Sequence, residues 1–98
     1  MKVTILGCGR VGARLANTLD AEGHEVSIID RNPDAFRRFL GEGFGGQAVV
    51  GVGIDEDVLR RAGLADADVF VAATNLDSVN AMAAQIAQLI FRVPKVIG

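Results

Sequence analysis

The stretch KVTILGCGRVG, residues 2–12, decides the fold of this chain. Its first five residues are largely apolar and β-branched, which predicts a strand over 2–6. Gly7, Gly9 and Gly12 follow with G-x-G-x-x-G spacing, and a helical pattern begins within them. A second apolar strand ends at Asp30, eighteen residues after Gly12. Strand, glycine turn, helix and terminal acid together predict a nucleotide-binding βαβ unit.

The rest of the chain alternates strands with helices. We expect further strands over 25–30, 47–50, 68–73 and 94–97, and helices over 10–22, 33–40, 55–62 and 77–92. The apolar residues of the strands at 5–6, 28–29 and 69–71 are continuous, which is typical of a parallel sheet covered on both faces. Right-handed crossovers then predict an α/β, Rossmann-like doubly wound sheet with strand order 3-2-1-4-5.

The helices show which faces we expect to be buried. Val11, Leu15 and Leu19 recur at four-residue spacing, which predicts that they form the inner face of the first helix. The last helix, 77–92, is apolar nearly all round. A second apolar face suggests burial against another subunit, and hence a homo-oligomer; a broad face within the domain is the alternative.

Length and composition limit the function classes. With 98 residues, the chain is predicted to form one nucleotide-binding domain over 1–98. A net charge of −2 argues against a nucleic-acid partner. There is no apolar run of the roughly 20 residues that spanning a bilayer requires, so we expect no direct membrane insertion. A single cysteine excludes an internal disulfide and fits a cytoplasmic setting.

The glycine loop is the predicted phosphate site. Gly7 permits the tight turn after the strand, Gly9 allows close approach of a pyrophosphate, and Gly12 lets the helix pack on the sheet. Free N–H groups at the helix start, Val11 included, would point at the phosphate. The guanidinium of Arg10 could bind a phosphate, with a surface salt bridge as the alternative. Cys8 is interpreted as a small packing residue rather than a nucleophile.

Other strand ends contribute to the same site. Asp30 is predicted to accept hydrogen bonds from the ribose hydroxyls of an adenosine, which favours NAD or an adenine nucleotide over NADP. Arg31 could stack on adenine or tolerate a 2′-phosphate, and plain solvation is an equal alternative. Gly51 and the pair Ala73-Thr74 end their strands at the same edge of the sheet.

Polar residues follow the fourth strand. Thr74 and Asn75 can reach the second ribose or the distal phosphate; capping of the last helix by Asn75, Asp77 or Ser78 is an equally good account. His24, the one histidine, falls in a helix-to-strand turn far from this edge and is expected to be exposed. Metal binding is not expected, because there is no His or Cys cluster.

With these residues, the chain resembles the N-terminal nucleotide-binding domain of Trk and Ktr potassium-uptake regulators, which is also called the RCK or KTN domain. The resemblance covers nearly the whole chain, in stretches at residues 5–12, 22–30, 58–68 and 72–80. The combination of Arg10 in the loop, AGLADAD at 62–68 and ATNLDSVN at 73–80 is much more specific than the glycine motif alone.

The resemblance implies a cytoplasmic regulatory subunit, peripheral to the inner membrane through a potassium channel or transporter subunit. It would bind NAD(H) or ATP/ADP and gate transport by changing the shape of a dimer or ring. By position, Gly7, Gly9, Arg10 and Gly12 would hold phosphates and Asp30 the ribose. Gly51 and Val52 would border the adenine, and Thr74 and its neighbours would line the other end.

This chain departs from the family pattern in two ways. Val52 and Ile54 stand where the family usually has an acid and often Thr or Ser, so polar contacts at the adenine edge are in doubt. The sequence also reaches only the start of a fifth strand, whereas family domains continue through another helix and strand. We therefore expect a domain truncated after its fifth strand.

The residues predict a binding module rather than an enzyme, because no acid, base or nucleophile stands opposite the predicted site. The alternative is the cofactor-binding half of an NAD-dependent dehydrogenase, whose first βαβ unit would look nearly the same. Such an enzyme would need a substrate domain carrying a catalytic Lys or His.

Overall fold

The computed structural model describes residues 1–98 and contains one parallel sheet with helices on both faces. Its elements in chain order are β1 (Lys2–Leu6), α1 (Arg10–Ala21), β2 (Glu25–Asp30), α2 (Pro33–Phe39), β3 (Gln47–Val50), α3 (Glu56–Arg61), the 3-10 helix η1 (Leu64–Asp66), β4 (Val69–Ala72), α4 (Asp77–Leu89) and β5 (Lys95–Ile97).

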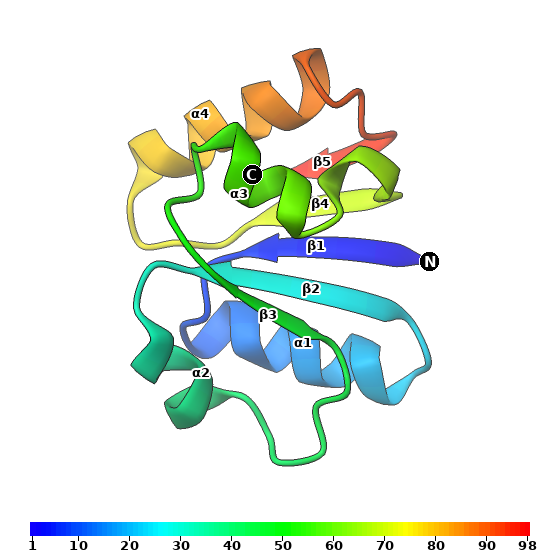
Figure 1. Cartoon of the computed structure of the whole chain (residues 1–98), viewed down its shortest axis with the longest axis vertical. Helices are drawn as coiled ribbons and strands as arrows, with labels where there is room; N and C mark the ends of the chain where they lie inside the picture. Colours follow the sequence, from blue (N-terminus) through cyan, green and yellow to red (C-terminus); the bar gives the residue numbers. More distant parts are fainter.

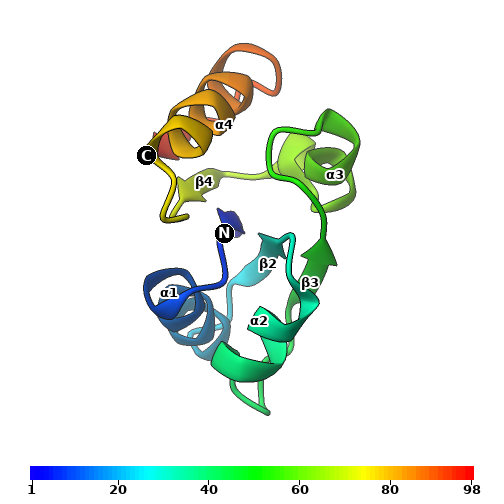
Figure 2. The ribbon, with the colours of Figure 1, turned by 90° about the vertical axis from the view of Figure 1, so that its left-hand side faces the viewer.

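The strand order is β3-β2-β1-β4-β5 and every neighbouring pair is parallel, which confirms the predicted Rossmann-like topology. Figures 1 and 2 show α1 and α2 on one side of the sheet and α3 and α4 on the other. The order reverses beside β1, so the carboxyl ends of β1, β2 and β4 meet at one edge.

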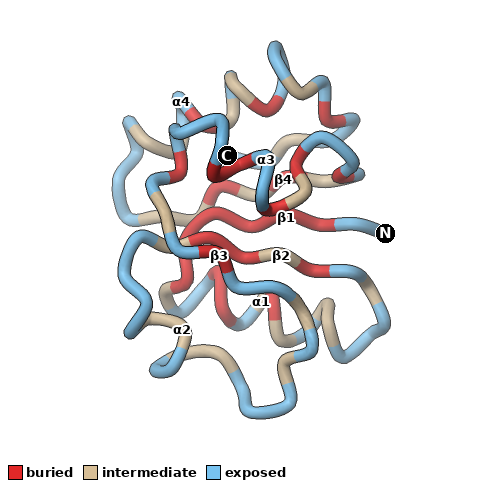
Figure 3. The backbone as a smooth tube through the Cα atoms, viewed as in Figure 1, coloured by how far each residue is buried: buried red, intermediate tan, exposed pale blue.

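Two apolar clusters hold the layers together. On the α3 and α4 side, Leu6, Ile29 and Phe70 of the sheet pack against buried residues that include Leu59 and Ala83. On the other side, sheet residues Val3, Ile5, Val26 and Ile28 pack against α1 and α2. Figure 3 shows this burial concentrated in the central strands. Burial on both faces explains why the sequences of these strands are continuous apolar runs.

The inner face of α1 differs from the prediction. Gly12, Ala13 and Ala16 are buried, whereas Leu15 is half-buried and Val11 is 73% exposed. Small residues face the sheet because α1 lies close to β1: a Cβ on Gly12 would lie 1.8 Å from the carbonyl oxygen of Gly7. Apolar spacing therefore identified the helix and two residues of its inner face, because Leu15 and Leu19 pack partly buried against the cluster on this side of the sheet. The prediction was wrong for Val11 and did not identify the fully buried small residues.

Helix α4 starts at Asp77, as predicted, but ends at Leu89 rather than near Arg92. Arg92 has a positive φ of 54°, which a continuing α-helix would not allow. The N-cap of α4 is Leu76, and neither Asn75, Asp77 nor Ser78 caps the helix with a side chain. No helix of the structure is both long and apolar enough to cross a membrane.

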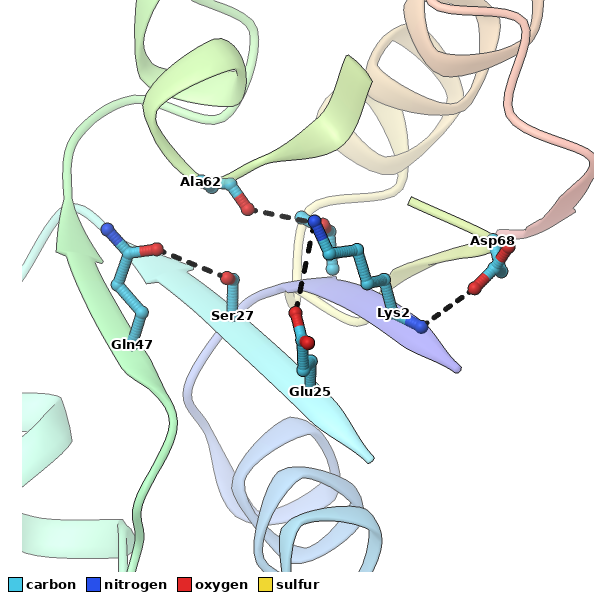
Figure 4. A network of polar contacts seen from close by, with 7 residues as sticks. Lys2, Glu25, Ser27, Gln47, Ala62 and Asp68 are labelled. Carbon is cyan, nitrogen blue, oxygen red and sulfur yellow. Dashed lines mark hydrogen bonds and ion pairs between the residues drawn. The ribbon is translucent and has the colours of Figure 1, made fainter. Parts of the chain in front are cut away.

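The amino ends of the strands are joined by a polar network that lies away from the glycine loop (Figure 4). Thr4 Oγ1 donates to the carbonyl of Ala62 at 3.4 Å, and Ser27 Oγ donates to Gln47 Oε1 at 3.4 Å. The N–H of Lys2 donates to the carboxylate of Asp68 at 2.8 Å. These bonds join β1 to the end of α3 and to the residue before β4, and they join β2 to β3.

Candidate nucleotide site at the carboxyl edge of the sheet

The glycine loop leaves β1 through a turn that only glycine suits. Gly7 has φ +108°, and a Cβ there would lie 2.7 Å from the carbonyl oxygen of Ala73. The N–H of Gly7 donates to the carbonyl of Ile29 at 2.7 Å, and that of Ala73 donates to Leu6 at 2.7 Å. The loop after β1 is thus fixed against the ends of β2 and β4.

The start of α1 carries the unpaired donors that the sequence predicted. The first helical bond runs from the N–H of Ala13 to the carbonyl of Gly9 at 3.0 Å, so the N–H groups of Gly9, Arg10, Val11 and Gly12 donate to no protein atom. A Cβ on Gly9 would meet nothing within 4 Å. Open space beside unpaired N–H groups at a helix N-terminus favours an anion such as phosphate.

Asp30 ends β2 beside this loop. One carboxylate oxygen accepts from the N–H of Cys8 at 2.8 Å, and the other accepts from the N–H of Asn32 at 2.9 Å. These bonds orient the carboxylate, and each oxygen keeps accepting capacity for a further donor. Asp30 is therefore held next to the glycine loop, as its position at the end of the second strand predicted.

Cys8 lies inside the loop but is not a reactive group. Its side chain is buried, and its thiol donates to the carbonyl of Ala35 at 3.6 Å. Burial, with a smaller contribution from the negative charge of Asp30, raises the pKa of the thiol to about 11. The thiol therefore stays protonated at neutral pH, which agrees with its interpretation as a packing residue.

Thr74 and Asn80 make a compact hydrogen-bonded unit behind the loop after β4. Asn80 Oδ1 accepts from the hydroxyl of Thr74 at 2.6 Å and from its N–H at 3.1 Å. Asn80 Nδ2 donates back to the Thr74 carbonyl at 3.0 Å. The Thr74 hydroxyl also accepts from the N–H of Leu76 at 3.2 Å. Thr74 therefore shapes the wall of the site, and its hydroxyl is already engaged.

Two adjoining pockets open at this edge. The larger, about 410 Å³, is lined by the glycine loop, Asp30 and the loop after β4. The smaller, about 140 Å³, lies beside it. They share four residues: Gly7, Asp30, Thr74 and Asn75.

The structure brings most of the predicted site residues together. The larger pocket contains Gly7, Gly9, Arg10, Val11, Asp30, Ala73, Thr74 and Asn75, and the smaller adds Arg31 and Val52. Gly12 and Gly51 line neither pocket. Gly12 supports the close packing of α1, and a Cβ on Gly51 would lie 2.6 Å from the side chain of Val58.

Four apolar residues of the smaller pocket were not predicted from the sequence: Leu6, Ile29, Leu76 and Val79. Leu6 and Ile29 end β1 and β2, so the rule that ligands bind at the carboxyl ends of strands could have identified them. Leu76 and Val79 depend on the path of the loop into α4, which no sequence pattern defines. Remote from both pockets, His24 lies near the amino end of β2, where its ring is 3.1 Å from the N-terminal amine.

No group of three or more His, Cys, Asp or Glu side chains is placed to hold a metal ion. The polar groups of the site are backbone N–H groups, the carboxylate of Asp30, the guanidinium groups of Arg10 and Arg31, the Thr74 hydroxyl and the Asn75 amide. Such a set matches a ligand that combines anionic phosphate with sugar hydroxyls.

Comparison with known proteins gives a consistent picture. The chain is 48% identical over 96 residues to the Trk system potassium uptake protein TrkA of Streptomyces coelicolor, covering 98% of this chain and 43% of that protein. It is 41% identical over 98 residues to the protein of the same name in Halomonas elongata, covering 100% of this chain and 21% of that protein. The chain thus spans less than half the length of these relatives.

Solved structures share the fold. The C-terminal domain of Kef from Shewanella denitrificans, in AMP-bound form, superposes with a TM-score of 0.82 at 25% identity, over 98% of this chain and 57% of that one. The NAD⁺-bound enzyme WbmH of Bordetella bronchiseptica gives a TM-score of 0.75 at 23% identity, over 97% of this chain and 37% of that one. The second likeness shows the fold alone.

The family is shown by the sequence itself. The model of the TrkA-N domain matches residues 3–98, which is nearly the whole chain. The relatives named above are potassium uptake proteins and not dehydrogenases. Together with the glycine loop, Asp30 and the β3-β2-β1-β4-β5 sheet, these matches show that the chain belongs to the TrkA-N domain family.

Proposed function

We propose that this domain binds an adenine nucleotide, NAD(H) or ATP/ADP, across the two pockets. The observation that carries the proposal is the set of unpaired N–H groups at the start of α1, facing open space beside an oriented Asp30. The phosphates would lie on the loop from Gly7 to Gly12, with Arg10 as an additional cation.

The other parts of the nucleotide follow from the neighbouring residues. Asp30, which both pockets share, would accept from the ribose hydroxyls. The smaller pocket, with Arg31 and Val52, would receive the base. Ala73, Thr74 and Asn75 would border the distal phosphate or second ribose. Nucleotide binding by the AMP-bound Kef domain supports this assignment.

We further propose that nucleotide binding regulates potassium transport rather than supporting catalysis. The relatives that share 41–48% identity are named potassium uptake proteins. Within the larger pocket, the one carboxylate is held by two backbone N–H groups and the one thiol is buried and protonated. The domain would act in the cytoplasm, reaching the inner membrane through a transporter or channel subunit.

A self-associating surface on α4 would transmit the effect of the nucleotide. Met82, Leu89 and Ile90 are exposed by 51%, 73% and 52%, although α4 already packs on the sheet through Ala83 and Ala87. We propose that a second copy of the chain covers this face. Light scattering should give at least a dimer mass, and Leu89→Lys should reduce it; a monomer at all concentrations would contradict this assembly.

Thermal unfolding with and without nucleotide tests the binding proposal. A ligand present at 100 times its Kd adds about 2.7 kcal/mol, which for a domain of roughly 100 residues raises the Tm by about 10 °C or more. We expect such a shift with at least one of NADH, NAD, ATP, ADP and AMP. NADPH is the matched control for NADH, because its 2′-phosphate would meet the carboxylate of Asp30 and give a smaller shift. No shift with any nucleotide would rule the proposal out.

A further inference from the structure

The smaller of the two pockets has more apolar side chains in its lining than the larger one, which contains the glycine loop. Five side chains of the smaller pocket are apolar: Leu6, Ile29, Val52, Leu76 and Val79. Val52 and Leu76 are 52% and 47% exposed, so they offer apolar surface that the fold itself does not cover. Flat aromatic rings gain most of their binding free energy from contact with such surface.

Recognition of adenine in particular would need an acceptor for its exocyclic amine. Replacing that amine by a carbonyl, as in hypoxanthine or guanine, turns a donor into an acceptor. A site built to hydrogen-bond the amine would reject these bases strongly, because its own polar group would be left unpaired. The identity of the free acceptors near the base therefore determines base specificity.

The polar side chains of this pocket supply no dedicated acceptor. The oxygens of Asp30 accept from the N–H groups of Cys8 and Asn32, and their remaining capacity would serve the ribose hydroxyls in the proposed function. The Thr74 hydroxyl donates to Asn80. Arg31 carries donors only and suits ring acceptors that all purines share, such as N7.

Two further side-chain positions near the pocket supply no fixed acceptor either. The exposed amide of Asn75 holds both a donor and an acceptor, so it can turn either group toward the base. On the loop after β3, Val52 and Ile54 have no polar side chain, and the carbonyl of Val52 accepts from the N–H of Asp55 at 3.1 Å.

We propose that this site takes purine nucleotides as a class and does not discriminate at the C6 position of the base. The inference rests on the proposed nucleotide function. It concerns the C6 substituent of the base, to which the protein would make no specific hydrogen bond. Phosphate, ribose and the flat shape of the base would provide the affinity. ADP, IDP and GDP should then bind with dissociation constants within about tenfold of one another, against factors of about 10⁴–10⁵ at sites built to hydrogen-bond the distinguishing group.

Calorimetric titration of the chain with ADP, IDP and GDP tests this inference, with two variants at one position. Val52→Asp places an acceptor at the exposed edge of the pocket and should raise the preference for ADP over IDP. Val52→Leu keeps the position apolar and should leave that ratio unchanged. Any general repulsion between the introduced carboxylate and the phosphates affects ADP and IDP equally and cancels in the ratio.

The outcomes separate the two proposals. A wild-type preference for ADP over IDP well above tenfold would overturn the purine-class inference while leaving nucleotide binding intact. An unchanged ratio in Val52→Asp would contradict the placement of Val52 at the base edge. Failure of all three nucleotides to bind would overturn the inference, and it would overturn the proposed function as well if NADH, NAD, ATP and AMP also gave no thermal shift.

Discussion

Gly9 and Gly12 stand three residues apart in one loop and have opposite surroundings. A Cβ on Gly12 would lie 1.8 Å from the carbonyl oxygen of Gly7, whereas a Cβ on Gly9 would meet nothing within 4 Å. Gly9 also has an extended backbone, with φ −93°, that any residue can adopt. Gly12 is thus required for the packing of α1 on the sheet, whereas Gly9 borders the open space in front of the helix.

These surroundings predict different results for the same substitution. Gly12→Ala should lower the free energy of unfolding by about 3 kcal/mol or more, because backbone must move to admit the methyl group. Gly9→Ala should change it by less than about 0.5 kcal/mol, yet weaken ADP binding at least about tenfold, because the methyl group occupies the path of the phosphate. Urea unfolding and calorimetric titration of both variants measure the two effects. Loss of stability in Gly9→Ala would contradict this division of roles.

Among single residues, those whose role follows from the backbone were predictable from the sequence. Gly7, Gly12 and Asp30 lie where strand ends and turn geometry place them. Thr74 was predicted to line the site, and it lines both pockets; the bond from its hydroxyl to Asn80 at 2.6 Å was not predicted. Side-chain partners across a loop depend on the path of that loop, so sequence spacing does not reveal them.

The loop between β4 and α4 depends on one side chain of the helix that follows it. Asn80, in the first turns of α4, makes three hydrogen bonds to the backbone and hydroxyl of Thr74. Since Thr74 lines both pockets, Asn80 is a positioning residue for the site although it lines neither.

Removing these bonds should affect both stability and binding. Asn80→Ala should lower the free energy of unfolding by about 1–3 kcal/mol, because it leaves partly buried groups of Thr74 unpaired. It should also weaken ADP binding, since the loop is no longer held. Gln88→Ala, at an exposed position of the same helix, is the matched control and should change neither. If Asn80→Ala lowers stability but leaves ADP affinity unchanged, its role is structural only.

Elements were predicted well where apolar runs and turn residues agree. Asn32 caps α2 and Asp55 caps α3 through their side chains, with Pro33 at the first position of α2. Prediction from the sequence was incomplete where small residues, rather than large apolar ones, form the buried face of a helix. The fully buried positions of α1 are Gly12, Ala13 and Ala16, because the close contact with the sheet admits only small residues there. Leu15 and Leu19, which the apolar spacing selected, pack beside them and are partly buried.

For the whole molecule, the strand order followed from the pattern of continuous apolar strands and right-handed crossovers. That order brings the ends of β1, β2 and β4 together, and thereby collects residues from 7 to 75 into one site. What the sequence could not predict is the division of this edge into two adjoining pockets, one at the glycine loop and one lined by Leu6, Ile29, Val52, Leu76 and Val79. That division depends on where Leu76 and Val79 lie in three dimensions.

The central claim is that the carboxyl edge of the sheet binds a nucleotide through the loop after β1. The most direct measurement is a ¹⁵N–¹H correlation spectrum of the chain during titration with ADP and, separately, with NADH. We predict that at least one of them shifts the amide signals of Gly9, Arg10, Val11 and Asp30 most, and leaves Ser27 and Gln47 at the opposite end unchanged. An unaltered glycine loop at saturating concentrations of both ligands, or shifts centred on Ser27 and Gln47, would contradict the claim.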